Sequence, residues 1–136
     1  MRLASYELTI AAPAAVVWAH LTTAAGLKRW VGPYATADPV AGGALRWTHP
    51  DGSTVLGRFV ELSPHRRVVF TYGWEDGRMG VAPESTTVEI DLTEKDGVTT
   101  LRLAHHGLPA AVVDDHQRGW EYFLSRLRDS SVGQAN

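Results

Sequence analysis

The 136-residue sequence predicts one α+β domain, in which a curved antiparallel sheet of six strands surrounds a long C-terminal helix. Two short helices are expected between the first and second strands. The prediction rests on alternating hydrophobicity with regular turns through most of the chain, on helical periodicity in the last segment, and on a length that suits a single core. We expect the domain to span residues 1–129 and residues 130–136 to form a flexible polar tail.

The N-terminal third begins with a strand and then turns helical. Residues 3–11 alternate, with Tyr6, Leu8 and Ile10 on one side, which predicts a half-buried strand. Pro13 suits the first turn of a helix that should reach about Thr22. A second short helix is expected over residues 24–30, before a Gly-Pro pair stops it.

Period-two hydrophobicity then continues through a meander of strands joined by short turns. The expected strands are residues 44–49, 54–62, 66–75, 85–94 and 98–106. In four of these strands every second residue is mostly apolar, and these residues should face inward. This set is Leu45, Trp47, Val68, Phe70, Tyr72, Trp74, Val88, Ile90, Leu92, Leu101, Leu103 and His105. Strand 54–62 is ambiguous, because Val55 and Phe59 oppose Leu56, Val60 and Leu62; a bulge near its glycine or burial of both faces would explain this.

The last segment predicts an amphipathic helix from about Pro109 to Arg128. Its apolar positions, at helical spacing, are Val113, His116, Trp120, Phe123, Leu124 and Leu127. Aspartates lie in its first turns and arginines near its end, as the helix dipole favours. Only the concave face of the sheet offers a large enough apolar surface to cover this stripe.

Composition excludes several kinds of function. Thirteen basic and fifteen acidic side chains nearly cancel, so neither a nucleic-acid groove nor a polybasic membrane anchor is expected. The absence of cysteine excludes disulfides, thiolate nucleophiles and cysteine-bound metals. The N-terminus lacks a secretory signal and no segment is apolar enough to span a membrane, so we expect a cytoplasmic protein. No nucleotide-binding or nucleophile-elbow motif is present, and no cofactor is expected.

Aromatic residues dominate the inward-facing set and suggest a pocket between sheet and helix. The candidate ligand-binding residues are Trp30, Trp47, Phe59, Phe70, Tyr72, Trp74, His105, His116 and Trp120. The alternative is that these side chains simply fill the core.

Three histidines, His49, His105 and His116, are also predicted to face inward. Each is either a hydrogen-bonded core residue or a group that orients a ligand. Their spacing matches no metal site, and no metal is expected. Catalysis would need a positioned acid or base, for which His105, His116, Tyr72 or Glu61 could serve, and no catalytic residue is assigned.

Several local motifs together resemble one superfamily. A helix ending in Leu21-Thr22 precedes a segment ending in Trp30-Val31-Gly32-Pro33. Further matches are Gly42-Gly43 before a strand and residues 64–72, 101–108 and 119–127. From about Tyr6 to Leu127 the chain resembles the START-like, or SRPBCC, helix-grip superfamily, and within it the branch of heat-shock-chaperone ATPase activator homologues. It differs in having Val31 where many members have a second bulky aromatic residue, which implies an altered pocket mouth.

The resemblance implies a helix-grip fold and a cavity that binds a small hydrophobic or aromatic ligand, in a monomer or homodimer. The alternative is an enzyme of the polyketide cyclase/aromatase or dehydratase type that uses the same cavity. A chaperone-associated interaction module is a third reading. It is disfavoured because the chain begins at the first strand of the helix-grip domain, without the additional N-terminal domain of the eukaryotic activator.

Overall fold

The computed structural model describes residues 3–135, which form seven strands and three α-helices. The strands are β1 (Ala4–Ile10), β2 (Tyr34–Ala37), β3 (Ala44–Thr48), β4 (Thr54–Ser63), β5 (Arg67–Trp74), β6 (Thr86–Lys95) and β7 (Val98–His106). The helices are α1 (Ala14–Thr22), α2 (Ala24–Leu27) and α3 (Val113–Ala135), with short 3-10 turns η1 (Arg78–Gly80) and η2 (Ala110–Val112).

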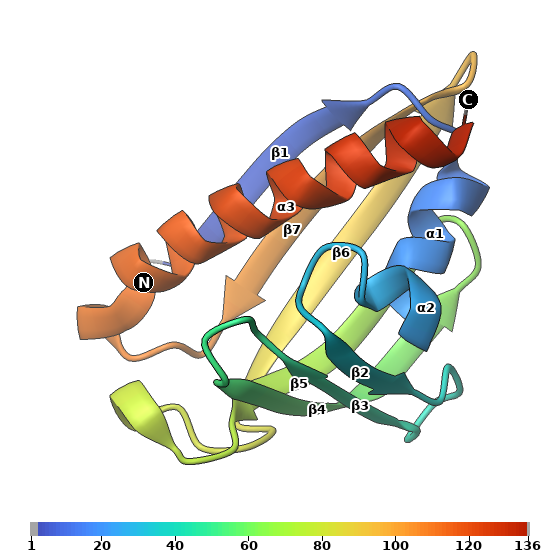
Figure 1. Cartoon of the computed structure of the whole chain (residues 1–136). Coiled ribbons are helices and arrows are strands. Elements are labelled where there is room, and N and C mark those ends of the chain that lie inside the picture. The colour runs from blue at the N-terminus through green and yellow to red at the C-terminus, as the bar shows by residue number, and fades with distance from the viewer. Residues whose placement is uncertain (1–2, 136) are drawn as a thin grey trace.

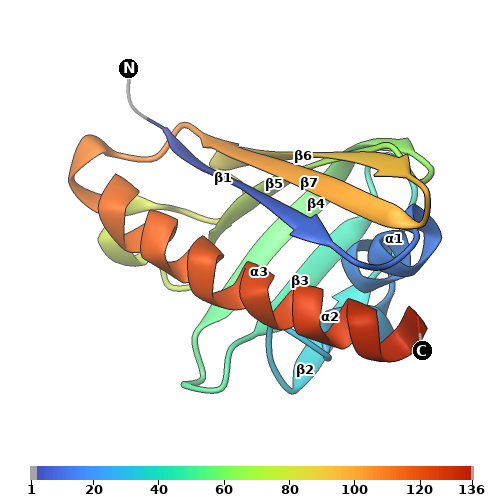
Figure 2. The same cartoon turned by 90° about the horizontal axis from the view of Figure 1, so that it is seen from above.

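All strands join one antiparallel sheet in the order β1-β7-β6-β5-β4-β3-β2. The sheet curls, and α3 runs along its concave side while α1 and α2 cover the end near β2 (Figure 1). Seen from above, α3 runs alongside β1 (Figure 2). This is the predicted helix-grip architecture, and the predicted inward parity of the strands is confirmed by their buried side chains.

The predicted strand count of six is wrong by one, because β2 was not recognised. This strand has only four residues, two of them alanines, and it follows directly after the Gly-Pro pair that was interpreted as a helix stop. Its strand geometry comes from pairing with β3, where Ala35 lies opposite Trp47. A segment this short and weakly patterned gives no signal of its own.

The ambiguous strand β4 contains a bulge, three residues later than expected. Phe59 lies opposite Phe70 and Glu61 opposite Val69, so Val60 is the extra residue, and its side chain is 53% exposed. The bulge reverses the parity, which lets Phe59 before it and Leu62 after it face the same side. The bulge therefore explains why the apolar residues of this strand do not follow a single alternation.

The helices differ from the prediction in length. Helix α2 ends at Leu27, so Trp30 lies in the turn that follows. Helix α3 continues past Arg128 to Ala135, through most of the segment expected to be a flexible tail; Ser131 is fully buried, and Asn136 lies outside the described residues. No helix within residues 3–135 is long and apolar enough to cross a membrane.

The inner stripe of α3 joins the hydrophobic core. Leu124 and Leu127 are fully buried and Trp120 is 6% exposed, whereas Glu121, beside this stripe, is exposed. Burial of this stripe is the main contribution of α3 to stability, because the helix carries few apolar residues elsewhere.

We therefore expect Leu124→Ala to lower the free energy of unfolding by about 2–5 kcal/mol through loss of apolar burial and creation of a cavity. The control Glu121→Ala should change it by less than about 0.5 kcal/mol. Urea denaturation of both variants tests this, and equal effects would contradict the packing of α3 on the sheet.

Candidate functional site

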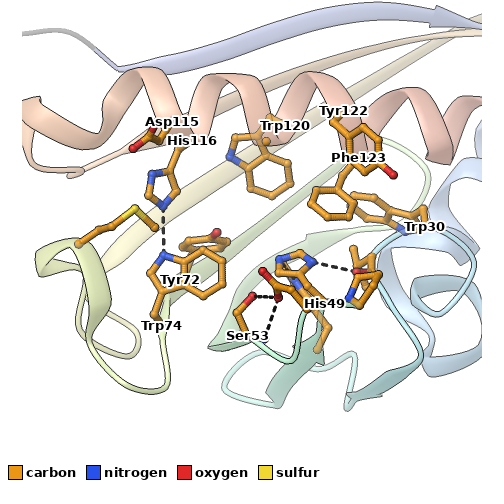
Figure 3. A pocket seen from close by; sticks show the side chains of 16 residues that line it. Trp30, His49, Ser53, Tyr72, Trp74, Asp115, His116, Trp120, Tyr122 and Phe123 are labelled. Atoms are coloured by element: carbon orange, nitrogen blue, oxygen red, sulfur yellow. Dashed lines mark hydrogen bonds between the residues drawn. The ribbon is translucent and has the colours of Figure 1, made fainter.

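A pocket of about 360 Å³ lies between the sheet and the N-terminal half of α3 (Figure 3). This volume is at the lower end of the range for small-molecule sites, about 300–1,000 Å³. Its walls come from β3, β5, α3 and three connecting segments. The lining residues are Trp30, Val31, Trp47, His49, Pro50, Asp51, Ser53, Tyr72, Trp74, Met79, Asp115, His116, Gly119, Trp120, Tyr122 and Phe123.

Six of the nine candidate residues line this pocket, namely Trp30, Trp47, Tyr72, Trp74, His116 and Trp120. The other three lie in the core behind it. Phe70 packs edge-on against Trp47, with ring centroids 5.9 Å apart, and Phe59 pairs with Phe70 across the sheet. His105 is fully buried, beyond Tyr72 and Trp120.

Three indole N–H groups donate hydrogen bonds to three imidazole nitrogens. Trp74 Nε1 donates to His116 Nε2 (3.2 Å), which links β5 to α3 and is drawn in Figure 3. Trp120 Nε1 donates to His105 Nδ1 (3.0 Å), which links α3 to β7. Trp47 Nε1 donates to His49 Nε2 (3.3 Å) at the end of β3. We call these contacts the Trp–His pairs.

The second nitrogen of each histidine is also hydrogen-bonded. His49 Nδ1 donates to the Val31 carbonyl (2.8 Å), and His116 Nδ1 donates to the Val112 carbonyl (2.8 Å). His105 Nε2 donates to Thr86 Oγ1 (2.8 Å), whose hydroxyl donates onward to the backbone carbonyl of Tyr72 (2.7 Å). An imidazole that accepts one hydrogen bond and donates another is neutral.

Burial favours this neutral state. It lowers the pKa of His105 to about 3, with further lowering by the imidazoles of His116 and His106. Burial also lowers the pKa of His49 and His116, although the carbonyl hydrogen bonds and nearby Asp51 and Asp115 oppose the shift. The three histidines are therefore neutral and hydrogen-bonded through both ring nitrogens; His105 and His116 are buried, whereas His49 is half-buried.

Tyr72 lies at the centre of these aromatic rings. Its ring centroid is 4.5 Å from that of His105 and 5.8–6.0 Å from those of Trp47, Trp74, His116 and Trp120. The residue is 4% exposed and lines the pocket, yet its hydroxyl makes no hydrogen bond with any residue in the described part of the chain. Burial raises the pKa of this hydroxyl, so it stays protonated and able to donate.

The mouth of the pocket is more polar and exposed. Asp51 accepts hydrogen bonds from the Ser53 backbone and hydroxyl (2.9 and 2.6 Å), which lower the pKa of its carboxyl. Asp115 pairs with Arg118. Met79 and Tyr122 are 39% and 58% exposed at the rim.

Most residues at the mouth of the pocket could not be predicted from the sequence. Asp51, Ser53 and Met79 lie in turns that only the folded sheet brings opposite α3, and no local pattern signals this. Phe123 and His49 had been placed inward by periodicity but not assigned to the site; their rings stack, with centroids 4.4 Å apart. Gly119 carries a weak signal in the sequence, because glycine inside a helix costs stability relative to alanine.

The histidine pKa shifts predict that the protein loses stability in acid. Below the unfolded-state pKa of about 6.5, the unfolded chain takes up a proton that buried His105 takes up only near pH 3, so the free energy of unfolding falls between these limits. His105→Asn should cost roughly 1–3 kcal/mol at neutral pH by leaving Trp120 unpaired. It should also flatten the acid slope by up to about 1.4 kcal/mol per pH unit.

Urea denaturation across this pH range checks both effects. The control is His65→Asn, an exposed histidine with φ of 68°, a left-handed conformation that asparagine tolerates. An unchanged slope in His105→Asn, or an equal change in the control, would contradict the buried neutral imidazole.

Comparison with known proteins identifies the family. The family model described as "Activator of Hsp90 ATPase homolog 1-like protein" matches residues 11–130. No match to the chain was found among curated proteins. Among solved structures, the HSP90 activator PFC0360w from Plasmodium falciparum is 27% identical, with a TM-score of 0.74 over 90% of this chain and 92% of that one.

Two further structures share the fold. DynU16, a protein of the dynemicin biosynthetic locus, is 25% identical with a TM-score of 0.78 over 93% of this chain; the match covers 46% of DynU16, so this chain spans about half its length. The Aha1 dimer from Colwellia psychrerythraea is 23% identical with a TM-score of 0.78, over 96% of both chains. With a family model that covers residues 11–130 and a helix-grip fold shared with these structures, the chain belongs to the family of Activator of Hsp90 ATPase homolog 1-like proteins.

Proposed function

We propose that this protein binds a small hydrophobic or aromatic ligand in the pocket between the sheet and α3. The observation that carries the proposal is a cavity of about 360 Å³ whose walls are the rings of Trp30, Trp47, Tyr72, Trp74 and Trp120. Concave sites with apolar and aromatic walls and few polar groups are typical of small-molecule binding. All lining residues belong to one chain, so the site is complete in a monomer and is compatible with a homodimer.

Gly119 supports an open pocket. It lies within α3 and lines the cavity, and a Cβ atom at this position would meet no atom within 4 Å. Glycine in a helix costs roughly 0.5–1 kcal/mol relative to alanine, so its presence here is not a matter of helix stability. A side chain at this position would occupy the cavity.

Catalysis in the same pocket is the second candidate, favoured by the likeness to DynU16, a protein of a biosynthetic locus. The geometry supports binding more strongly. His105 and His116 have both nitrogens committed to protein partners, and Glu61 pairs with Arg67. Of the acid–base candidates, Tyr72 alone presents a free polar atom within the described residues, and its raised pKa suits donation of a hydrogen bond more than proton abstraction.

A role with a chaperone ATPase is a third candidate, on the basis of the family and of the likeness to PFC0360w, an HSP90 activator. It has less support than ligand binding, because the feature that stands out in this chain is an internal aromatic cavity.

To test the proposed function, we expect the neutral fluorescent probe N-phenylnaphthylamine to bind the wild-type protein and to change its tryptophan fluorescence. Gly119→Leu should reduce probe affinity at least tenfold by filling the cavity. Gly133→Leu is the matched control, since Gly133 lies in the same helix, is exposed, and also has free space beside its Cα.

Both variants should remain folded, because leucine favours helix over glycine. Fluorescence titration gives the affinities and circular dichroism checks the helix content. Failure of the wild type to bind, or equal binding by Gly119→Leu, would contradict the proposed function.

A further inference from the structure

The pocket wall presents one unsatisfied polar atom at depth. The indole nitrogens of Trp47, Trp74 and Trp120 are used in the Trp–His pairs, and Trp30 Nε1 donates to the His20 carbonyl (2.7 Å). The remaining aromatic surface at depth is therefore ring faces and edges, which carry no free donor. The Tyr72 hydroxyl is the exception among the described lining residues.

The charged side chains that line the pocket mouth are acidic. Asp51 and Asp115 line the pocket, whereas its described lining residues include no lysine or arginine. Arg118 is held by Asp115. Arg78 is held by Asp76 (2.7 Å), and its guanidinium lies over the ring of Trp74, 5.7 Å from the ring centroid. A carboxylate ligand would lose its hydration and find no free cation in exchange.

We infer that Tyr72 determines the specificity of the site, which selects an uncharged aromatic ligand bearing one oxygen that hydrogen-bonds to the Tyr72 hydroxyl. The inference rests on the proposed function of the pocket. The ligand's rings pack on Trp30, Trp47 and Trp120, and its carbonyl, ether or hydroxyl oxygen accepts the hydrogen bond from Tyr72. The volume of about 360 Å³ suits a compound of a few fused or linked rings.

The specificity arises from the cost of leaving the buried hydroxyl unpaired. A purely hydrocarbon ligand would expel water from the pocket and leave Tyr72 without a partner, whereas an oxygen at the right position replaces the lost hydrogen bond. A site that contains a buried polar group therefore discriminates against ligands that lack its complement.

The test uses naphthalene, naphthol and naphthoate as probes, with calorimetric titration of the wild type, Tyr72→Phe and the control Tyr34→Phe. The wild type should bind naphthol about 3- to 10-fold more tightly than naphthalene, which corresponds to one net hydrogen bond. It should bind naphthoate more weakly than naphthol. In Tyr72→Phe the preference for naphthol over naphthalene should disappear, because naphthol affinity falls while naphthalene affinity is kept or rises.

Tyr72→Phe removes a hydroxyl that bonds to no described residue, so the variant should fold, and its thermal unfolding is checked first. Tyr34→Phe removes an exposed hydroxyl on β2, outside the pocket lining, and should keep the wild-type preference. Asp51→Asn should raise naphthoate affinity severalfold relative to naphthol affinity.

The outcomes separate the two proposals. If none of the three probes, nor N-phenylnaphthylamine, binds the wild type, the proposed function itself fails. If the probes bind but the preference for naphthol is absent, or persists in Tyr72→Phe, the proposed function stands and the role of Tyr72 is overturned. If naphthoate binds as tightly as naphthol, the selection against carboxylates is overturned.

Discussion

The pocket depends on hydrogen bonds from indole N–H groups to neutral imidazole nitrogens. An indole can only donate and a neutral imidazole can accept once, so each of the three Trp–His pairs satisfies two polar groups without adding charge. The pairs Trp74–His116 and Trp120–His105 connect α3 to β5 and β7. Because these hydrogen bonds satisfy the indole and imidazole nitrogens, the deep wall is apolar apart from the Tyr72 hydroxyl.

The architecture brings these side chains together. Strong curvature of the sheet lets α3 pack along its concave side, with Leu124 and Leu127 closing the core near its C-terminal half. The bulge at Val60 lets Phe59, before it, and Leu62, after it, both point to the inner face of the sheet. Toward the N-terminal half of α3 the helix carries Gly119, which lines the pocket and has open space beside its Cα.

Much of this could be predicted from the sequence, because alternation and helical spacing report which way a side chain points. They placed Trp47, Tyr72, Trp74, His116 and Trp120 inward, and these residues line the pocket. Periodicity does not report depth along a strand, and so Phe59, Phe70 and His105 were assigned to the site although other side chains cover them. Asp51 and Met79 were missed because their positions depend on tertiary folding, and β2 because its strand geometry depends on pairing with β3.

The Trp–His pairs hold the pocket walls only if each imidazole is neutral and in one defined tautomer. Long-range proton–nitrogen NMR of the histidine rings tests it most directly, since it reads which nitrogen carries the proton. We expect protonated Nδ1 in His49 and His116 and protonated Nε2 in His105, with slowly exchanging indole protons on Trp74 and Trp120. Protonated Nε2 in His116, or protonated Nδ1 in His105, would remove the acceptor from its indole partner and would rule out the corresponding Trp–His pair.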